Sequence, residues 1–153
     1  MKVQTADLGD LDGLVALAAG VEPWFGPMVS DRGFLEALDR NIGRGSAFVV
    51  RGQGDRLLGG ILTGGRAPSY RINWLVVDEG ARRCGVGRVL VDHVIDLCQR
   101  PCGLEVVTFG KDHPAANLSG ARAFYERLGF VGGSAEADGP EGGSRQRFRL
   151  TLG

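Results

Sequence analysis

The chain has 153 residues, a hydrophobic fraction of 43% and a charged fraction of 24%, values typical of a soluble globular protein. This length suffices for a buried core, so we expect residues 1–153 to form a single domain. No apolar stretch approaches the roughly 20 residues of a membrane span, and no signal-peptide segment follows the first residues, which predicts a cytoplasmic protein. Basic and acidic residues number 18 each, so no overall field attracts nucleic acid or an anionic membrane.

The cysteines and histidines do not predict a metal site. Cys84, Cys98 and Cys102 lack the paired spacing of metal ligands, and the two histidines lie far apart in the chain. We therefore expect no bound metal and interpret the three cysteines as ordinary thiols in a reducing compartment.

The first third of the chain predicts one short strand and two helices. Residues 3–6 are extended, and the apolar positions between Leu11 and Ala18 recur at helical spacing. The stretch EPWFGPMVSD (22–31) contains two prolines and a glycine, so we expect a loop with adhesive apolar side chains. A second helix starts at Ser30 or Asp31 and ends near Gly43 or Gly45.

The remaining residues predict strands and helices in a mixed order. Strands are expected at 46–51, 56–64 and 70–77, and in the third of these Ile72, Trp74 and Val76 should share one face. A helix follows over 86–98, then a strand at 103–109, one amphipathic helix in AANLSGARAFYERLGF (115–130) and two closing extended segments. This order predicts a mixed α/β or α+β domain with no internal repeat.

The segment ARRCGVGRVL (81–90) follows an apolar strand and opens a helix. Free N–H groups and the positive end of a helix dipole meet at such a point, and Gly85 and Gly87 would let an anion approach the main chain closely. An ordinary tight turn with arginines on its wet side is the alternative interpretation. The third glycine of G-x-G-x-x-G and the lysine of a P-loop are absent, so neither of those nucleotide motifs is supported.

Two motifs in this chain resemble those of the GNAT (GCN5-related) N-acetyltransferase family. RRCGVG (82–87) is similar to the family's R/Q-x-x-G-x-G/A loop, and NLSGARAFYERLGF (117–130) resembles its second motif, an Asn before a helix with A-x-x-F-Y-x-x-x-G-F. The order of predicted elements also matches, so the resemblance covers nearly the whole chain. It implies an acyl-CoA N-acyltransferase fold, with a mixed central sheet of about six to seven strands flanked by about four helices.

The resemblance implies acetyl-CoA as cosubstrate, bound without a metal. Main-chain N–H groups from about Arg83 to Arg88 would bind its pyrophosphate, and the main chain of the third strand would pair with the pantetheine arm. The amide of Asn117 would face the same groove, although capping of the helix explains Asn117 equally well. The residues expected at the coenzyme are Leu75, Val76, Val77, Arg82, Arg83, Cys84, Gly85, Val86, Gly87, Arg88, Asn117 and Tyr125.

The resemblance also implies direct attack of an uncharged amine on the acetyl carbonyl, with no acyl-enzyme. Tyr125 occupies the place of a tyrosine near the thioester sulfur and is our predicted catalytic acid, with packing in the core as the alternative. A main-chain N–H near Val76 or Val77 would polarise the carbonyl oxygen. Glu22 is the first candidate for the base, because apolar neighbours would raise its pKa; the other candidates are Asp31, Asp78, Glu79 and Glu105.

The acceptor side is predicted at PWFGPM (23–28). Trp24, Phe25 and Met28 lie between prolines and would form a semi-rigid apolar wall, which favours a small-molecule amine as acceptor. A protein or peptide amine, or a non-catalytic acyl-CoA sensor of the same fold, is the alternative function. The edge of the last strand offers a surface for a homodimer.

Overall fold

The computed structural model describes residues 1–139 and 141–153, and at position 117 the main chain alone. In this part of the chain one sheet has seven strands in the order β1-β2-β3-β4-β5-β7-β6. All neighbouring strands pair antiparallel except β4 and β5, which are parallel. The strands are β1 Val3–Thr5, β2 Ala47–Arg51, β3 Leu57–Arg66, β4 Ser69–Val77, β5 Cys102–Phe109, β6 Val131–Glu136 and β7 Arg145–Leu152.

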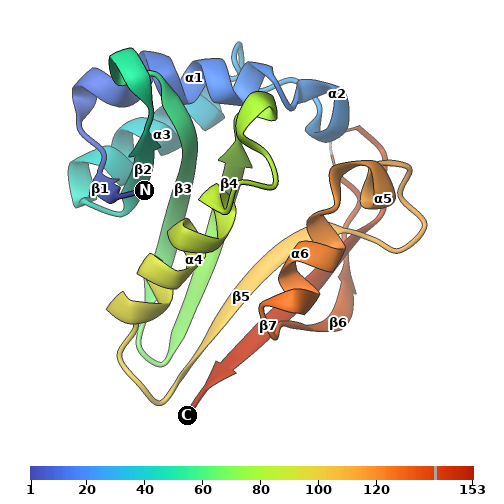
Figure 1. The fold of residues 1–153 in the computed structure, drawn as a ribbon. Coiled ribbons are helices and arrows are strands. Elements are labelled where there is room, and N and C mark those ends of the chain that lie inside the picture. Colours follow the sequence, from blue (N-terminus) through green and yellow to red (C-terminus); the bar gives the residue numbers. More distant parts are fainter. Residues whose placement is uncertain (140) are drawn as a thin grey trace.

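Helices cover both faces of this sheet (Figure 1). One core cluster joins the sheet to α4 and α6 through Leu90, Val94 and Tyr125, and a second joins the other face to α1 and α3 through Leu14 and Leu38. The mixed sheet between helical layers confirms the predicted fold class. The helices are α1 Leu11–Ala19, α2 Glu22–Phe25, α3 Arg32–Arg44, α4 Val86–Leu97, α5 Ala115–Ser119 and α6 Ala121–Arg127.

The strands β4 and β5 pair over only part of their length. Their register runs from Ser69 opposite Gly103 to Ile72 opposite Val106 and then stops. Figure 1 shows the two strands diverging beyond that point, toward the end of the sheet where α2 lies. The second half of β4 therefore has a free main-chain edge on its β5 side.

A bulge in β4 changes which side chains share a face. The register with β3 shifts between Leu62, opposite Trp74, and Thr63, opposite Ile72, which leaves Asn73 as the extra residue. Ile72 consequently packs in the first core cluster, while Trp74 and Val76 belong to the second. The prediction that Ile72 shares a face with Trp74 and Val76 was wrong, because regular alternation fails at a bulge.

Two predicted elements differ from the structure. The expected single helix over 115–130 is divided into α5 and α6 by Gly120, which adopts a left-handed conformation with φ 69°. The expected loop 22–31 begins with a helical turn, α2, in which Pro23 occupies an early position where a missing N–H costs nothing. In both places the backbone geometry of a single residue, Gly120 or Pro23, explains why the structure differs from the prediction.

None of the helices among the described residues is long and apolar enough to cross a membrane. The residues described also contain no group of His, Cys, Asp and Glu side chains that could hold a metal ion.

Candidate active site

The free edge of β4 presents the main chain of Leu75 and Val77. The N–H of Asp78 donates to the carbonyl of Leu58 in β3 at 2.8 Å. Because bonding direction alternates along an antiparallel pair, Val76 also directs its N–H and C=O toward β3, whereas Leu75 and Val77 direct theirs away. Their polar groups therefore face the gap between β4 and β5, where an extended chain can pair with them.

The loop after β4 leads these strands into α4 with several unused N–H groups. Gly85 caps the helix with φ 87° and ψ 6°, and no side chain bonds to the helix start. The first bond into the helix runs from the N–H of Val89 to the carbonyl of Gly85 at 3.1 Å. The N–H groups of Val86, Gly87 and Arg88 thus have no acceptor within α4, as is general for a first helical turn. With the helix dipole they form a site for an anion.

The two glycines of this loop have different tasks. A Cβ added to Gly85 would meet nothing within 4 Å, so only its left-handed backbone demands glycine. A Cβ added to Gly87 would lie 3.1 Å from the Phe124 ring and 3.6 Å from Val77. Gly87 is therefore needed for close packing of α4 against α6, a role that the sequence motif alone did not indicate.

The three arginines of the loop lie around its mouth. The guanidinium of Arg82 stacks over the Trp24 ring, 4.3 Å from its centroid. Arg83 adopts a positive φ of 63°, unusual for a residue other than glycine, and its side chain is exposed. Arg88 lies 3.8 Å from Asp92, one turn along α4. All three line the same cavity and add positive charge beside the free N–H groups.

That cavity has a volume of about 890 Å³ and joins the predicted elements of the site. It extends from α2 past the end of β4 and the loop to α6, within the size range of cofactor sites. Most of the cavity wall on α6 was not predicted from the sequence, although the apolar spacing of that helix could have indicated it. The lining residues are Val21, Trp24, Phe25, Leu75, Val76, Val77, Glu79, Ala81, Arg82, Arg83, Gly85, Val86, Gly87, Arg88, Leu118, Ser119, Gly120, Ala121, Ala123, Phe124, Tyr125, Arg127 and Leu128.

Tyr125 lines this cavity from α6 and is otherwise enclosed. Its exposed fraction is 5%, and its ring packs edge-on against Phe124 at 5.1 Å and Phe130 at 5.4 Å between centroids. Burial raises the pKa of its phenol above the usual value, because the anion would lose its hydration. The hydroxyl therefore keeps its proton at every physiological pH and can donate a hydrogen bond to a group in the cavity.

The carboxylate of Glu22 is bonded within its own segment of the chain, and Glu22 does not line the cavity where a base would meet the substrate. Its Oε2 accepts hydrogen bonds from the N–H of Met28 at 2.5 Å and of Val29 at 3.1 Å, and Glu22 is not among the lining residues. The carboxylate thus closes the loop after α2. Met28 also lies off the cavity and packs in the second core cluster, so the predicted apolar wall consists of Trp24 and Phe25.

The other candidate bases are mostly engaged elsewhere. Asp31 caps α3 by accepting from the N–H of Phe34 at 3.0 Å, and Asp78 pairs with Arg56 at 2.6 Å. Glu105 accepts from Arg147 at 2.6 Å and from Arg149 at 3.1 Å. Of the five predicted carboxylates, Glu79 alone lines the cavity, where β4 leads into the loop before α4.

Two predicted coenzyme residues remain outside the wall described above. Cys84 is exposed, its thiol donates to the carbonyl of Arg82 at 3.6 Å, and it is not a lining residue. The side chain of Asn117 lies outside the described part of the structure, so its predicted amide contact is untested. The break of the helix at Gly120 does mean that Asn117 and Tyr125 belong to separate helices.

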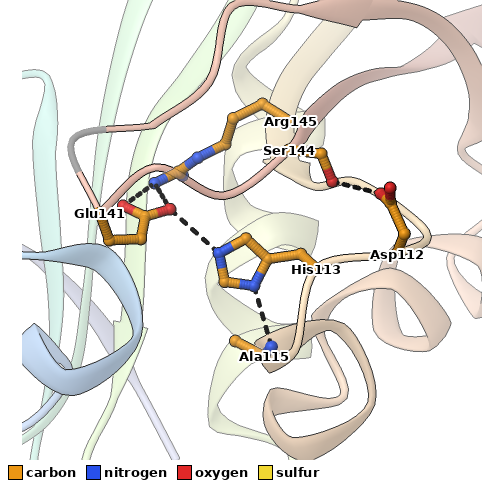
Figure 2. A network of polar contacts seen from close by, with 6 residues as sticks. All are labelled: Asp112, His113, Ala115, Glu141, Ser144 and Arg145. Atoms are coloured by element: carbon orange, nitrogen blue, oxygen red, sulfur yellow. Dashed lines mark hydrogen bonds and ion pairs between the residues drawn. The ribbon is translucent and has the colours of Figure 1, made fainter.

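A polar network joins His113, Glu141 and Arg145 beside α5 (Figure 2). His113, 7% exposed, accepts from the N–H of Ala115 through Nδ1 at 2.9 Å, so its Nε2 carries the proton and donates to Glu141 at 3.1 Å. Arg145 donates to both oxygens of Glu141 at 2.7 and 2.8 Å. These bonds hold the loop between β6 and β7 against α5.

The same network reaches the cavity wall through aromatic rings. Phe25 stacks on Phe109 at 4.7 Å between centroids, and Phe109 lies 4.5 Å from the His113 ring. The Arg145 guanidinium lies 5.5 Å from both Phe rings. Phe25 is therefore held by Phe109 of β5 and Arg145 of β7, which makes α2 a firm edge of the cavity.

Comparison with known proteins identifies the family. A sequence model described as "Acetyltransferase (GNAT) domain" matches residues 43–132, which is more than half of the chain and includes β4, the loop, α4 and α6. The chain belongs to the GNAT acetyltransferase family. Acetyl transfer from acetyl-CoA is the chemistry of this fold, and it agrees with a cavity that joins an anion-binding loop to a free strand edge.

Solved structures share the fold at low sequence identity. Ard1 from Thermoplasma volcanium has a TM-score of 0.79 at 19% identity, covering 99% of this chain and 97% of its own. The ribosomal-protein-S18-alanine N-acetyltransferase from Escherichia coli has 0.73 at 18%, covering 99% and 93%. A NatC complex bound to Gag peptide and CoA has 0.74 at 16%, covering 99% and 98%. A search of curated protein sequences gave no significant match.

Proposed function

We propose that this chain transfers the acetyl group of acetyl-CoA directly to a primary amine, with a small molecule as the first acceptor class. The observation that carries the proposal is one cavity bounded by the free edge of β4, the N–H groups that open α4, and the buried phenol of Tyr125. The proposal includes the cytoplasmic location, the single domain and the homodimer predicted from the sequence.

In this proposal the coenzyme lies along β4 and ends at the loop. The N–H groups of Val86, Gly87 and Arg88 bind its pyrophosphate, and Arg82 and Arg83 add charge. From there the pantetheine arm runs back along the strand, so it pairs first with Val77 and then with Leu75. These residues fit the coenzyme because their main-chain groups are free toward the gap that the arm would fill.

The reaction follows from what surrounds the thioester. A neutral amine attacks the acetyl carbonyl, and the N–H of Leu75 or Val77 stabilises the negative oxygen. The strand's alternation turns the N–H of Val76 toward β3, so that residue is no longer our candidate donor. The C–S bond then breaks while Tyr125 donates its proton to the departing sulfur. The attacking nitrogen, which is positively charged after the attack, returns a proton to the tyrosinate through water in the cavity.

Deprotonation of the acceptor ammonium needs no dedicated side chain in this mechanism. The carboxylate of Glu22 is held by two main-chain N–H groups, so we assign Glu22 a positioning role in the loop after α2. Water in the cavity carries the proton away before or during attack. A base role for Glu22 would instead require its carboxylate to leave these two bonds.

The class of acceptor is tested by an acetyl-transfer assay over several kinds of amine. Release of free coenzyme thiol would be measured over a panel of small amines and peptides, with wild type and Tyr125→Phe, alongside acetyl-CoA binding by calorimetry. Two of the similar structures are a ribosomal-protein-S18-alanine N-acetyltransferase and a NatC complex bound to Gag peptide and CoA, which makes peptides the second class. Tight acetyl-CoA binding without turnover on any amine would replace the proposal with a non-catalytic sensor.

A further inference from the structure

A second cavity lies on the opposite face of β4 from the α4 and α6 layer. Its volume is about 340 Å³, and it is enclosed by α3 and the first part of β4. Its wall carries Arg40 and Arg44 from α3 and Arg71 and Trp74 from β4. We call this cavity the arginine pocket.

The positive charge of the arginine pocket is not neutralised within the described residues. Arg40, Arg44 and Arg71 have no carboxylate at ion-pair distance there, whereas Arg51, Arg145, Arg147 and Arg149 each have one. The guanidinium of Arg71 makes one neutral hydrogen bond, from Nε to the Asn73 side chain at 3.0 Å. All three side chains are exposed, so water screens their mutual repulsion, and an anion in the pocket would meet three guanidinium groups without a carboxylate partner among the described residues.

One residue of the same wall, Trp74, also carries an unused hydrogen-bond donor. The Nε1 of Trp74 is buried and has no acceptor among the described residues. Leaving such a donor unpaired costs about 1–3 kcal/mol, so native proteins rarely tolerate it without a ligand or water. The other buried polar side chain of the wall, Asn41, is already bonded to Ala37 and Ser46. A ligand oxygen that reached Nε1 of Trp74 would accept the hydrogen bond that this donor lacks.

The position of the pocket relates it to the transfer reaction. Trp74 directly precedes Leu75, whose main chain faces the coenzyme gap, but its side chain packs on the opposite face of the sheet. At about 3.3 Å per residue, Arg71 lies roughly 13 Å along β4 from Leu75. The two cavities share no lining residue, so only an acceptor long enough to span this distance can have its amine at the thioester and a second group among the arginines.

We propose that the arginine pocket binds a carboxylate or phosphate group of the acceptor amine. This inference rests on the proposed function and deepens it, because it names the acceptor class as amines that carry an anionic group several bonds from the nitrogen. Planar guanidinium groups suit both anions, and the rings of Phe34 and Trp74, 5.6 Å apart between centroids, cover the apolar chain between the two ends.

The first test uses matched amines. Acetylation of 12-aminododecanoate, whose extended chain covers the roughly 13 Å between Leu75 and Arg71, is compared with that of its uncharged amide, with 12-aminododecyl phosphate as the phosphate arm. A peptide arm compares Ala-Ala-Ala-Glu amide with Ala-Ala-Ala-Gln amide. We expect wild type to favour the charged member by about tenfold or more in kcat/KM, as for charge-assisted hydrogen bonds. The Arg40→Gln/Arg44→Gln double variant should lose that preference while keeping its activity on the uncharged member.

Arg32→Gln is the matched control, since Arg32 is an exposed arginine of the same helix that does not line the pocket. It should keep the preference for the charged amine. Equal use of both members by wild type would overturn the proposal. The same loss in Arg32→Gln would also overturn it, because the effect would then come from overall charge.

The second test measures binding without turnover. In a Trp24→Phe background Trp74 is the only tryptophan, so its fluorescence reports titration with glutarate. We expect saturable binding that weakens about tenfold in the double variant. Trp74→Phe, followed by calorimetry, should bind glutarate more weakly with no loss of thermal stability. Absence of glutarate binding overturns the pocket alone, whereas failure of acetyl-CoA to bind overturns the proposed function.

Discussion

The Arg82 guanidinium lies 4.3 Å from the centroid of the Trp24 ring. This contact joins the loop before α4 to α2, and both elements line the same cavity. Arg82 of the loop and Trp24 of α2 thus hold each other in position. Since α2 is itself fixed through Phe25 and Phe109, the loop has a firm neighbour before any ligand binds.

The contact between Arg82 and Trp24 predicts an energetic coupling. In a double-mutant cycle with Arg82→Gln and Trp24→Leu, we expect a coupling of about 0.5–1 kcal/mol in the free energy of unfolding. Leucine keeps apolar surface while removing the π face, so the cycle isolates the cation–π term. Urea unfolding measures it, and strictly additive effects of the two substitutions would contradict the prediction.

The loop glycines predict a graded loss of acetyl-CoA binding. Gly85→Val must place a β-branched residue at φ 87°, at a cost of about 1–2 kcal/mol, and the loop will distort away from the pyrophosphate. We expect acetyl-CoA affinity to fall at least tenfold, more than in Arg83→Gln or Arg88→Gln. Calorimetric titration measures this.

Gly45→Val is the control for that substitution. Gly45 also has a positive φ, 71°, and open space around its Cβ position, but it ends α3 outside the coenzyme cavity. It should show the same loss of stability with unchanged acetyl-CoA affinity. If losing either arginine harmed binding more than Gly85→Val, the assignment of the site to main-chain N–H groups would be wrong.

Much of the fold could be predicted because apolar spacing is a local property. The strands, α3 and α4 follow from residues that repeat at the period of their own element, and the loop motif lies within six residues. The bulge at Asn73 and the break at Gly120 could not be predicted in this way. Each is one residue that departs from a pattern its neighbours still follow.

The roles of charged side chains depend on partners that sequence spacing does not reveal. Glu141 meets His113 across 28 positions, and Glu22 binds the N–H groups of a loop that follows it. The arginine pocket assembles Arg40, Arg44 and Arg71 from a helix and a strand. Such contacts exist only after the chain has folded, so the motif predicts a coenzyme site but gives no prediction of the residues that would bind the acceptor.

Tyr125→Phe tests the proposed acid. Because the hydroxyl would stabilise only the departing thiolate, kcat should fall by about 10²-fold or more while acetyl-CoA affinity stays within a factor of two or so. Tyr70→Phe is the matched control, since the hydroxyl of Tyr70 accepts from Gln99 at 3.1 Å, outside the cavity. An unchanged kcat in Tyr125→Phe would reduce Tyr125 to a packing residue.

The raised pKa of Tyr125 also predicts the shape of the pH profile. An acid must be protonated to act, and the phenol stays protonated above its ordinary value of 10.0. We expect kcat to rise with pH as the acceptor ammonium loses its proton, without a decline near pH 10 caused by Tyr125. A descending limb centred near 10 in wild type that vanishes in Tyr125→Phe would contradict this.

Glu141 predicts a pH-dependent stability. Burial opposes its charge, but a backbone hydrogen bond, His113 and Arg145 outweigh burial and hold the folded pKa below the usual 4.5. A depressed pKa contributes stability that is present above the unfolded value and is lost as pH falls through the folded one. We therefore expect Glu141→Gln to lower unfolding free energy by about 1–2 kcal/mol at pH 7.

That deficit should shrink as pH falls below 4.5 toward the folded pKa, because wild type then loses the same charge. Glu126→Gln, at an exposed position on α6, is the control and should have little effect at any pH. Chemical unfolding at a series of pH values measures both. A Glu141→Gln deficit that stayed constant down to pH 2 would show that the charge does not act.

Glu22→Gln separates a positioning role from a base. The carboxylate accepts from two main-chain N–H groups, so the neutral amide should weaken the loop after α2 and raise the acceptor KM by about three- to tenfold. The pH dependence of kcat should be unchanged, because no proton passes through this group. Glu36→Gln, exposed on α3, is a suitable control. A kcat that fell about 100-fold, with loss of the acidic limb of the profile, would instead make Glu22 the general base.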